Sequence, residues 1–180
     1  MVIKKKYTAY ILSAALGVSS AWAVGNDVTA ASSAVEGVNV QGGSGAIDPN
    51  DPAYQGREFL KENAKKPGVV TLKSGLQYRV IQPGTGAKPG AHDIITANYE
   101  GRHLDQTIFD SSYSRKQPIT FKLSEVIPGW QEALLLMRKG AVWMVYVPTD
   151  LAYGDLGAGS VIKRNETLIF KIQLVDFKRT

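Results

Sequence analysis

The residue types that usually carry catalysis are scarce in this chain of 180 residues. It has no cysteine, which excludes thiol nucleophiles, disulfides, zinc–cysteine sites and iron–sulfur clusters. The only histidines, His92 and His103, flank a predicted strand at a spacing that fits no standard metal motif. Phosphate-binding glycine loops, nucleotide fingerprints and Gly-x-Ser-x-Gly elbows are also missing. We therefore expect neither a metal nor a cofactor. Acid–base hydrolysis by paired carboxylates stays open, although no pair is singled out by its surroundings.

The sequence does contain a different pattern that could form a site, in which aromatic and aliphatic residues are interleaved with turn residues. Five such motifs follow one another: Tyr99-Glu100-Gly101, Phe109-Asp110-Ser111-Ser112, Val126-Ile127-Pro128-Gly129-Trp130, Asp150-Leu151-Ala152-Tyr153-Gly154 and Thr167-Leu168-Ile169-Phe170. Taken alone, apolar residues at strand spacing are usually packing. The carboxylate of Asp110 and the hydroxyl of Tyr153 favour a function, because such groups enter apolar surroundings only when they have partners.

The elements that must position these motifs are mostly strands. Apolar residues alternate with polar ones over 76–80, and short β-type runs recur at 94–99, 119–123, 141–147 and 167–177. One segment after Pro128 has the helical period instead, with one apolar face formed by Trp130, Ala133, Leu134 and Met137. The pattern predicts an α+β architecture, in which an antiparallel sheet of about five strands packs on one short helix.

The end of this short helix is also marked in the sequence. We expect Arg138 and Lys139 in its last turn, where positive charge suits the helix dipole. Gly140 can adopt the left-handed conformation that stops a helix.

The first 23 residues have the order of a secretory signal peptide. Three lysines at 4–6 precede an apolar stretch at 10–18 and the small residues Ala21 and Ala23. The apolar stretch is shorter than the ~20 residues of a membrane span, so we expect cleavage near Ala23 rather than a stable membrane anchor. Because three lysines and no acidic residue leave with this segment, the net charge falls from +5 to +2. We therefore expect no nucleic-acid partner, and a periplasmic or secreted location.

The remaining chain divides into three parts. Residues 24–50 are dominated by Ala, Ser, Gly, Val and Asn and are predicted to be a flexible, low-complexity arm. Residues 51–68 are predicted to be an N-terminal helix, with Asp51 as its N-cap and Pro52 at the first helical position. A helix of this length is marginal alone, so we expect it to dock on the domain at 69–180.

In the order and spacing of its five motifs, the sequence resembles the FK506-binding-protein family of peptidyl-prolyl cis–trans isomerases, and most closely its exported, Mip-like bacterial branch. The resemblance covers about residues 56–178. It implies a strongly twisted sheet wrapped on one short helix, with an apolar cleft between them. It also implies an enzyme that accelerates X-Pro rotation in folding exported proteins. The expected partners are proline-containing unfolded or extended polypeptides, and macrolides of the FK506 and rapamycin type as inhibitors.

The resemblance also implies roles for individual positions. Trp130 would form the floor of the cleft, and the N–H of Ile127 would bind a substrate carbonyl. Asp110 and Tyr153 would be the catalytic polar groups at the rim. The other substrate-binding residues would be Tyr99, Phe109, Ile119, Val126, Ile162 and Phe170.

The chain departs from its relatives at three places. Ile119 stands where many of them have an aromatic wall residue. Lys163 and Arg164 stand where they commonly have proline, which predicts a looser and more charged rim and an altered macrolide affinity. The Mip-like branch commonly dimerises through a long N-terminal helical region, which residues 24–50 cannot supply. We therefore expect a monomer.

The physics of X-Pro rotation suits a site without nucleophile, base or metal. The barrier of ~18–20 kcal/mol comes from amide resonance, and the twisted transition state loses the charge separation of the planar amide. A dry, apolar cleft should therefore favour the twisted state. The alternative is a non-catalytic peptide-binding module or holdase chaperone of the same fold. The pair Asp110 and Tyr153 favours the enzyme, because a pure binder has no need of both.

Overall fold

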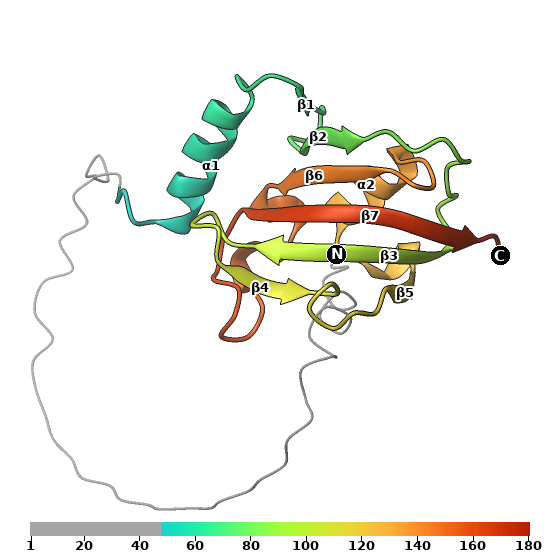
Figure 1. Ribbon diagram of the computed structural model, residues 1–180. Coiled ribbons are helices and arrows are strands. Elements are labelled where there is room, and N and C mark those ends of the chain that lie inside the picture. Colours follow the sequence, from blue (N-terminus) through green and yellow to red (C-terminus); the bar gives the residue numbers. More distant parts are fainter. Residues whose placement is uncertain (1–47) are drawn as a thin grey trace, which may run out of the picture.

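The computed structural model describes residues 48–180, which form a twisted antiparallel sheet with a helix on one face (Figure 1). The predicted signal peptide at 1–23 and residues 24–47 of the predicted arm lie outside the described residues. Across 48–180, no helix is long and apolar enough to cross a membrane.

The predicted antiparallel sheet is confirmed, with seven strands in place of about five. Their order is β1-β2-β6-β7-β3-β4, and β5 pairs with the other end of β3. The two strands that the pattern missed, β1 and β4, are three and four residues long, too short to show a clear alternation. The strands are β1 (Val69–Thr71), β2 (Gln77–Gln82), β3 (Ile94–Arg102), β4 (Ile108–Ser111), β5 (Ile119–Lys122), β6 (Val142–Val147) and β7 (Leu168–Lys178).

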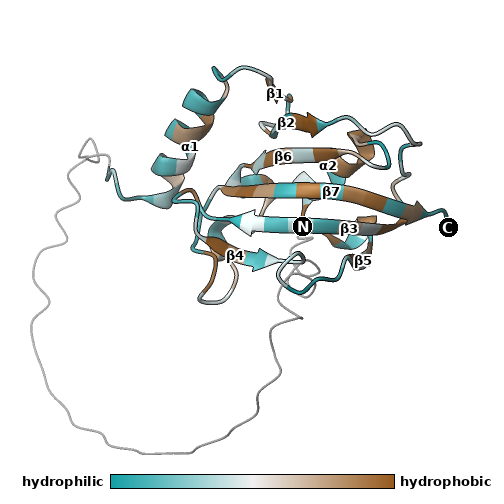
Figure 2. Cartoon of the chain, viewed as in Figure 1, coloured by the Kyte–Doolittle hydropathy of each residue, from teal (hydrophilic) through white to brown (hydrophobic). Residues whose placement is uncertain are grey.

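The two central strands place the site residues on the covered face. On β3 every second residue is buried, including Ala97 and Tyr99, and on β7 the buried set includes Phe170 and Ile172. Hydrophobic and hydrophilic residues accordingly alternate along β7 (Figure 2). Because β3 and β7 pair directly, with Tyr99 opposite Ile172, both strands present apolar side chains to the same core.

The short helix α2 (Pro128–Leu136) fills that face of the sheet. All four residues of its predicted apolar face are buried, and Gly129 allows the close approach, since a Cβ there would lie 2.5 Å from Val147 Cγ1. The predicted end of the helix is wrong. Met137 is already extended, so Arg138 and Lys139 lie beyond the last turn. Gly140 has the expected positive φ of 86°, but in the connection to β6.

The N-terminal helix α1 (Pro52–Asn63) begins as predicted, because the side chain of Asp51 accepts a hydrogen bond from the Ala53 N–H. It ends at Asn63, five residues before the end of the predicted segment. The helix docks on β2 through buried amides, with Asn63 Nδ2 donating to Gln77 Oε1 at 2.9 Å. Three single-turn helices complete the chain: η1 (Leu123–Glu125), η2 (Thr149–Leu151) and η3 (Gly154–Leu156).

Candidate functional site

The floor of the candidate site is the indole of Trp130, near the start of α2. It is fully buried and meets the rings of Tyr99 and Phe170 nearly edge to face, with centroids 5.2 and 5.3 Å apart. Phe121 on β5 adds a tilted contact at 5.7 Å. Such aromatic pairs add about 0.5–1.5 kcal/mol each beyond the area that they bury. The floor is therefore a rigid apolar surface.

One wall of the site continues from this floor along β7 and β4. The rings of Phe170 and Phe109 are perpendicular, with centroids 5.8 Å apart. Gly101 on β3 makes room for both, since a Cβ there would lie 2.6 Å from Phe109 Cζ and 2.9 Å from Phe170 Cε1. The absence of a side chain at 101 thus lets the two rings meet.

A polar triangle stands beside the aromatic floor. The carboxylate of Asp110 accepts a short hydrogen bond from the Tyr99 hydroxyl and a second one from Arg115 Nη1 at 2.5 Å. Arg115 Nη2 also donates to the Tyr99 hydroxyl at 3.0 Å. The Asp110 side chain is only 12% exposed, so its charge is held by these two partners. Burial, followed by the neighbouring Asp110, raises the pKa of Tyr99 far above its ordinary value.

The hydroxyl of Tyr153 differs from that of Tyr99, because it is buried and has no hydrogen-bond partner among the described residues. Burial raises the pKa of Tyr153, and the charge of Asp110 raises it further, so the phenol stays protonated and can donate. The backbone N–H of Ile127, at the N-cap of α2, likewise meets no acceptor within 48–180. The indole Nε1–H of Trp130 is also buried without a partner in that range, so three donors are available at the apolar floor.

The structure brings the predicted site residues together. One hydrophobic cluster contains nine of them, and Asp110 joins it through Tyr99. Six are buried within the cluster and three, from β4, β5 and the segment after η2, are partly buried against it: Tyr99, Val126, Ile127, Trp130, Ile162 and Phe170, then Phe109, Ile119 and Tyr153.

The sequence reasoning missed Arg115, Phe121 and Ser112. Ser112 Oγ accepts the Tyr99 N–H at 2.9 Å and so fixes the strand beside the triangle. Arg115 lies five residues after Asp110 in an irregular turn, where no periodicity predicts that the two side chains meet. Phe121 was part of a predicted strand, and its inward register could have indicated it.

No group of three or more His, Asp or Glu side chains within 48–180 is arranged to hold a metal ion. The site therefore offers apolar contact, one paired carboxylate and three hydrogen-bond donors that are unpaired among the described residues: the Tyr153 hydroxyl, Trp130 Nε1–H and the backbone N–H of Ile127.

Residues 85–175 match the family described as FKBP-type peptidyl-prolyl cis-trans isomerase, and residues 48–80 match the domain amino-terminal to it. The chain belongs to the FKBP-type peptidyl-prolyl cis–trans isomerase family. The family that the sequence motifs indicated is thereby confirmed.

Two curated relatives lie close to this chain. It is 55% identical to the peptidyl-prolyl cis-trans isomerase Mip of Coxiella burnetii over 71% of this chain and 55% of that protein. It is 54% identical to the outer membrane protein MIP of Legionella longbeachae over 69% of this chain and 54% of that one. The chain thus spans about half the length of these relatives.

A solved structure matches over its whole length. It is the peptidyl-prolyl cis-trans isomerase of Pseudomonas syringae, which is 39% identical, with a TM-score of 0.68 over 75% of this chain and 100% of that one. The β-rich unit described here is therefore an arrangement that also stands alone as a crystallised chain.

Proposed function

We propose that this chain is a peptidyl-prolyl cis–trans isomerase that acts on exported proteins. The observation that carries the proposal is the unpartnered Tyr153 hydroxyl beside the buried floor of Trp130, together with the free N–H of Ile127. Leaving a hydroxyl buried without a partner costs about 1–3 kcal/mol. A substrate carbonyl would remove that cost.

In the proposed complex the proline ring lies on the Trp130 indole, between the walls that Phe109 and Phe170 form. The Ile127 N–H and the Tyr153 hydroxyl hold carbonyls on either side of the ring, so that the flanking chain is fixed while the X-Pro bond turns. Fixing both ends restricts the rotation to one path, which is a positioning contribution. Exclusion of water removes the solvation that favours the planar, charge-separated amide.

Asp110 acts without proton transfer in this mechanism. Its two oxygens are occupied by Tyr99 and Arg115, so it is not available as a base. Its negative charge lies near enough to Tyr153 to contribute, after burial, to the raised pKa of that phenol. There it opposes the negative charge on the planar amide oxygen and favours the twisted amide, in which that charge is reduced.

Refolding of a proline-limited protein tests the proposal. The wild-type chain should accelerate the slow phase, Tyr153→Phe should reduce that acceleration severalfold, and Asp110→Ala should reduce it further, because it also releases Tyr99 and Arg115. Tyr54→Phe on α1 is the matched control and should behave as wild type. If the wild type suppresses aggregation but leaves the slow phase unchanged, the holdase alternative replaces the isomerase.

The proposed setting is the periplasm or the exterior, after cleavage near Ala23, with the mature chain a monomer. Mass spectrometry of the protein recovered from an exporting host would give its N-terminus, and sedimentation at micromolar concentration would give its mass. Retention of residues 1–23, or a dimer mass, would contradict these two points. The proposed ligands are proline-containing extended polypeptides and macrolides of the FK506 type, and binding of either is measured by the change in intrinsic tryptophan fluorescence.

A further inference from the structure

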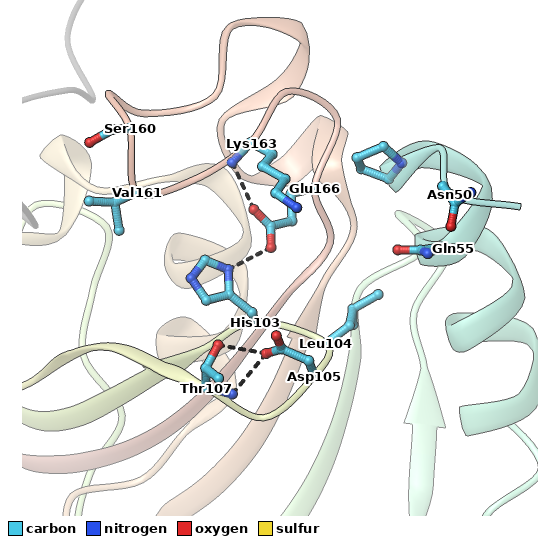
Figure 3. Close-up of a pocket in the computed structure, with 11 residues that line it drawn as sticks. Asn50, Gln55, His103, Leu104, Asp105, Thr107, Ser160, Val161, Lys163 and Glu166 are labelled. Carbon is cyan, nitrogen blue, oxygen red and sulfur yellow. Dashed lines mark hydrogen bonds and ion pairs between the residues drawn. The ribbon is translucent and has the colours of Figure 1, made fainter. Parts of the chain in front are cut away.

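A hollow with a volume of about 310 Å³ lies apart from the aromatic floor. Three segments far apart in the sequence line it: the start of α1, the turn between β3 and β4, and the loop at 160–166 (Figure 3). Beside it, His103 Nδ1 lies 2.6 Å from Glu166 Oε1. The two side chains are 22% and 11% exposed, so the contact is well shielded from water.

Glu166 holds the rim loop as well as the histidine. Its second oxygen, Oε2, accepts the backbone N–H of Lys163 at 2.8 Å (Figure 3). A proline at 163 would have no N–H to donate. The carboxylate therefore restrains the loop through a backbone N–H that a proline at 163 could not supply.

Further hydrogen bonds close the same loop. Arg164 Nε donates to the Asp155 carbonyl at 2.6 Å, and the Asn165 N–H donates to the Gly154 carbonyl at 2.8 Å. These bonds join the loop to η3, whereas the His103 contact ties it to the β3–β4 turn.

His103 also touches the aromatic wall of the cleft. Its ring lies 5.0 Å from that of Phe109, centroid to centroid, and Phe109 packs against Phe170. The loop that Glu166 anchors carries Ile162, which is buried in the site cluster. His103 is thus the link between two sides of the cleft mouth, the Phe109 wall and the Ile162 rim.

We propose that His103 and Glu166 are positioning residues for substrate binding: their contact, here called the clasp, sets the distance between the Phe109 wall and the Ile162 rim. The proposal rests on the proposed isomerase site. It predicts that loss of the clasp weakens binding of the planar substrate and leaves the rotation step almost intact. The reason is that the clasp touches neither Trp130 nor Tyr153 and holds only the walls.

The test uses three variants of the full chain: His103→Leu, Glu166→Ala and the double variant. KM and kcat are measured with a short Leu-Pro peptide, and peptide Kd is measured by Trp fluorescence. Each single change should raise KM and Kd about threefold to tenfold, with kcat within about twofold. The double variant should be no worse than the more affected single variant, because both changes break one contact.

Three further variants separate the clasp from a general loss of structure. His103→Asn keeps a donor near the position of Nδ1 and should recover most of the affinity. His92→Leu removes the other, exposed histidine, and Gln55→Ala changes the hollow without touching the clasp. Both should leave KM at the wild-type value. If His103→Leu does not fold, its measurement is replaced by a comparison of His103→Asn with Glu166→Gln. The latter keeps one acceptor oxygen.

The outcomes distinguish the clasp from the proposed function. Unchanged KM and Kd in both single variants, or additive effects in the double variant, would overturn the clasp. A wild type that binds the peptide without isomerising it would refute the proposed function, while Kd still measures the clasp. A wild type that does not bind would overturn both.

Discussion

The floor and the rim of the cleft are held by different forces. Trp130 on the floor and the rings of Tyr99 and Phe170 that pack on it are fully or almost fully buried and held by ring packing. The rim, formed by the segment after Asp110 and the loop at 154–166, is held by hydrogen bonds and ion pairs of partly exposed side chains such as Arg115. Apolar packing responds to volume, whereas polar contacts respond to charge and salt. Changes in the floor should therefore affect stability most, and changes in the rim should affect substrate handling.

The largest effect is expected for Trp130→Ala. Removing the indole leaves a cavity among three other aromatic rings, which should lower the free energy of unfolding by about 3–5 kcal/mol in urea denaturation. Trp143→Ala is the matched control, because Trp143 is also buried but its ring stacks on Tyr78, which is not one of the candidate site residues. It should lose stability and, while folded, keep its affinity for peptide. A loss below about 1 kcal/mol for Trp130→Ala would mean that the floor is not a packed unit.

A smaller loss is expected when the wall is overfilled. Gly101→Ala places a Cβ 2.6 Å from the Phe109 ring, which must move, at a cost of about 1–3 kcal/mol. Because Phe109 forms the wall, KM for a proline peptide should rise as well. In Gly90→Ala the new Cβ meets only ordinary contacts near 3.7 Å, so the free energy of unfolding and KM should both stay close to wild type. Equal stability and KM in the two variants would show that the Phe109 ring can move at little cost.

The rim should respond differently to loss of an ion pair. Arg115→Met removes two hydrogen bonds from the polar triangle and should cost about 1–2 kcal/mol, with a severalfold loss of refolding activity. Lys139→Met breaks a pair with Asp176 whose side chains are about half exposed, and should cost at most about 1 kcal/mol with no effect on activity. Full activity of Arg115→Met would show that the polar triangle does not contribute to the isomerase activity.

The floor could be predicted from the sequence more fully than the rim. Trp130 and Phe170 lie in segments with clear helical and strand periodicity, so their burial follows from local pattern. Phe109 and Asp110 lie on a strand of four residues, which only the resemblance to known relatives indicated. The pattern was wrong at the end of α2, where burial of Met137 in an extended conformation overrides the favourable charges of Arg138 and Lys139.

The rim depends on contacts that no local pattern encodes. Arg115 meets Asp110 across an irregular turn, and His103 meets Glu166 over a separation of 63 residues. The sequence suggested that Lys163 and Arg164 loosen the rim because they replace proline. The hydrogen bonds that these two residues make span only three and nine residues of the chain, but they lie in irregular segments where no periodicity indicates them.

The smallest expected effect concerns the pH at which tyrosines ionise: Tyr99 and Tyr153 should ionise at a higher pH than exposed tyrosines. Burial and Asp110 raise the pKa of both Tyr99 and Tyr153, whereas in the unfolded chain each ionises near 10.0. The unfolded state therefore releases these protons first, so the stabilising contribution is complete below pH 10 and is lost as the pH rises further. Absorbance at ~295 nm, where ionised tyrosine absorbs, follows the titration.

Tyr153→Phe should then leave the titration of the native chain unchanged below about pH 11, but lower its amplitude in denaturant by one tyrosine. The variant should also lose less stability than wild type as the pH rises from about 10 to 11, because one group that favours the unfolded state at high pH is gone. A drop in the native amplitude would show that the Tyr153 phenol ionises readily. The phenol would then be solvated rather than buried, and the available donor on which the proposed substrate contact depends would not exist.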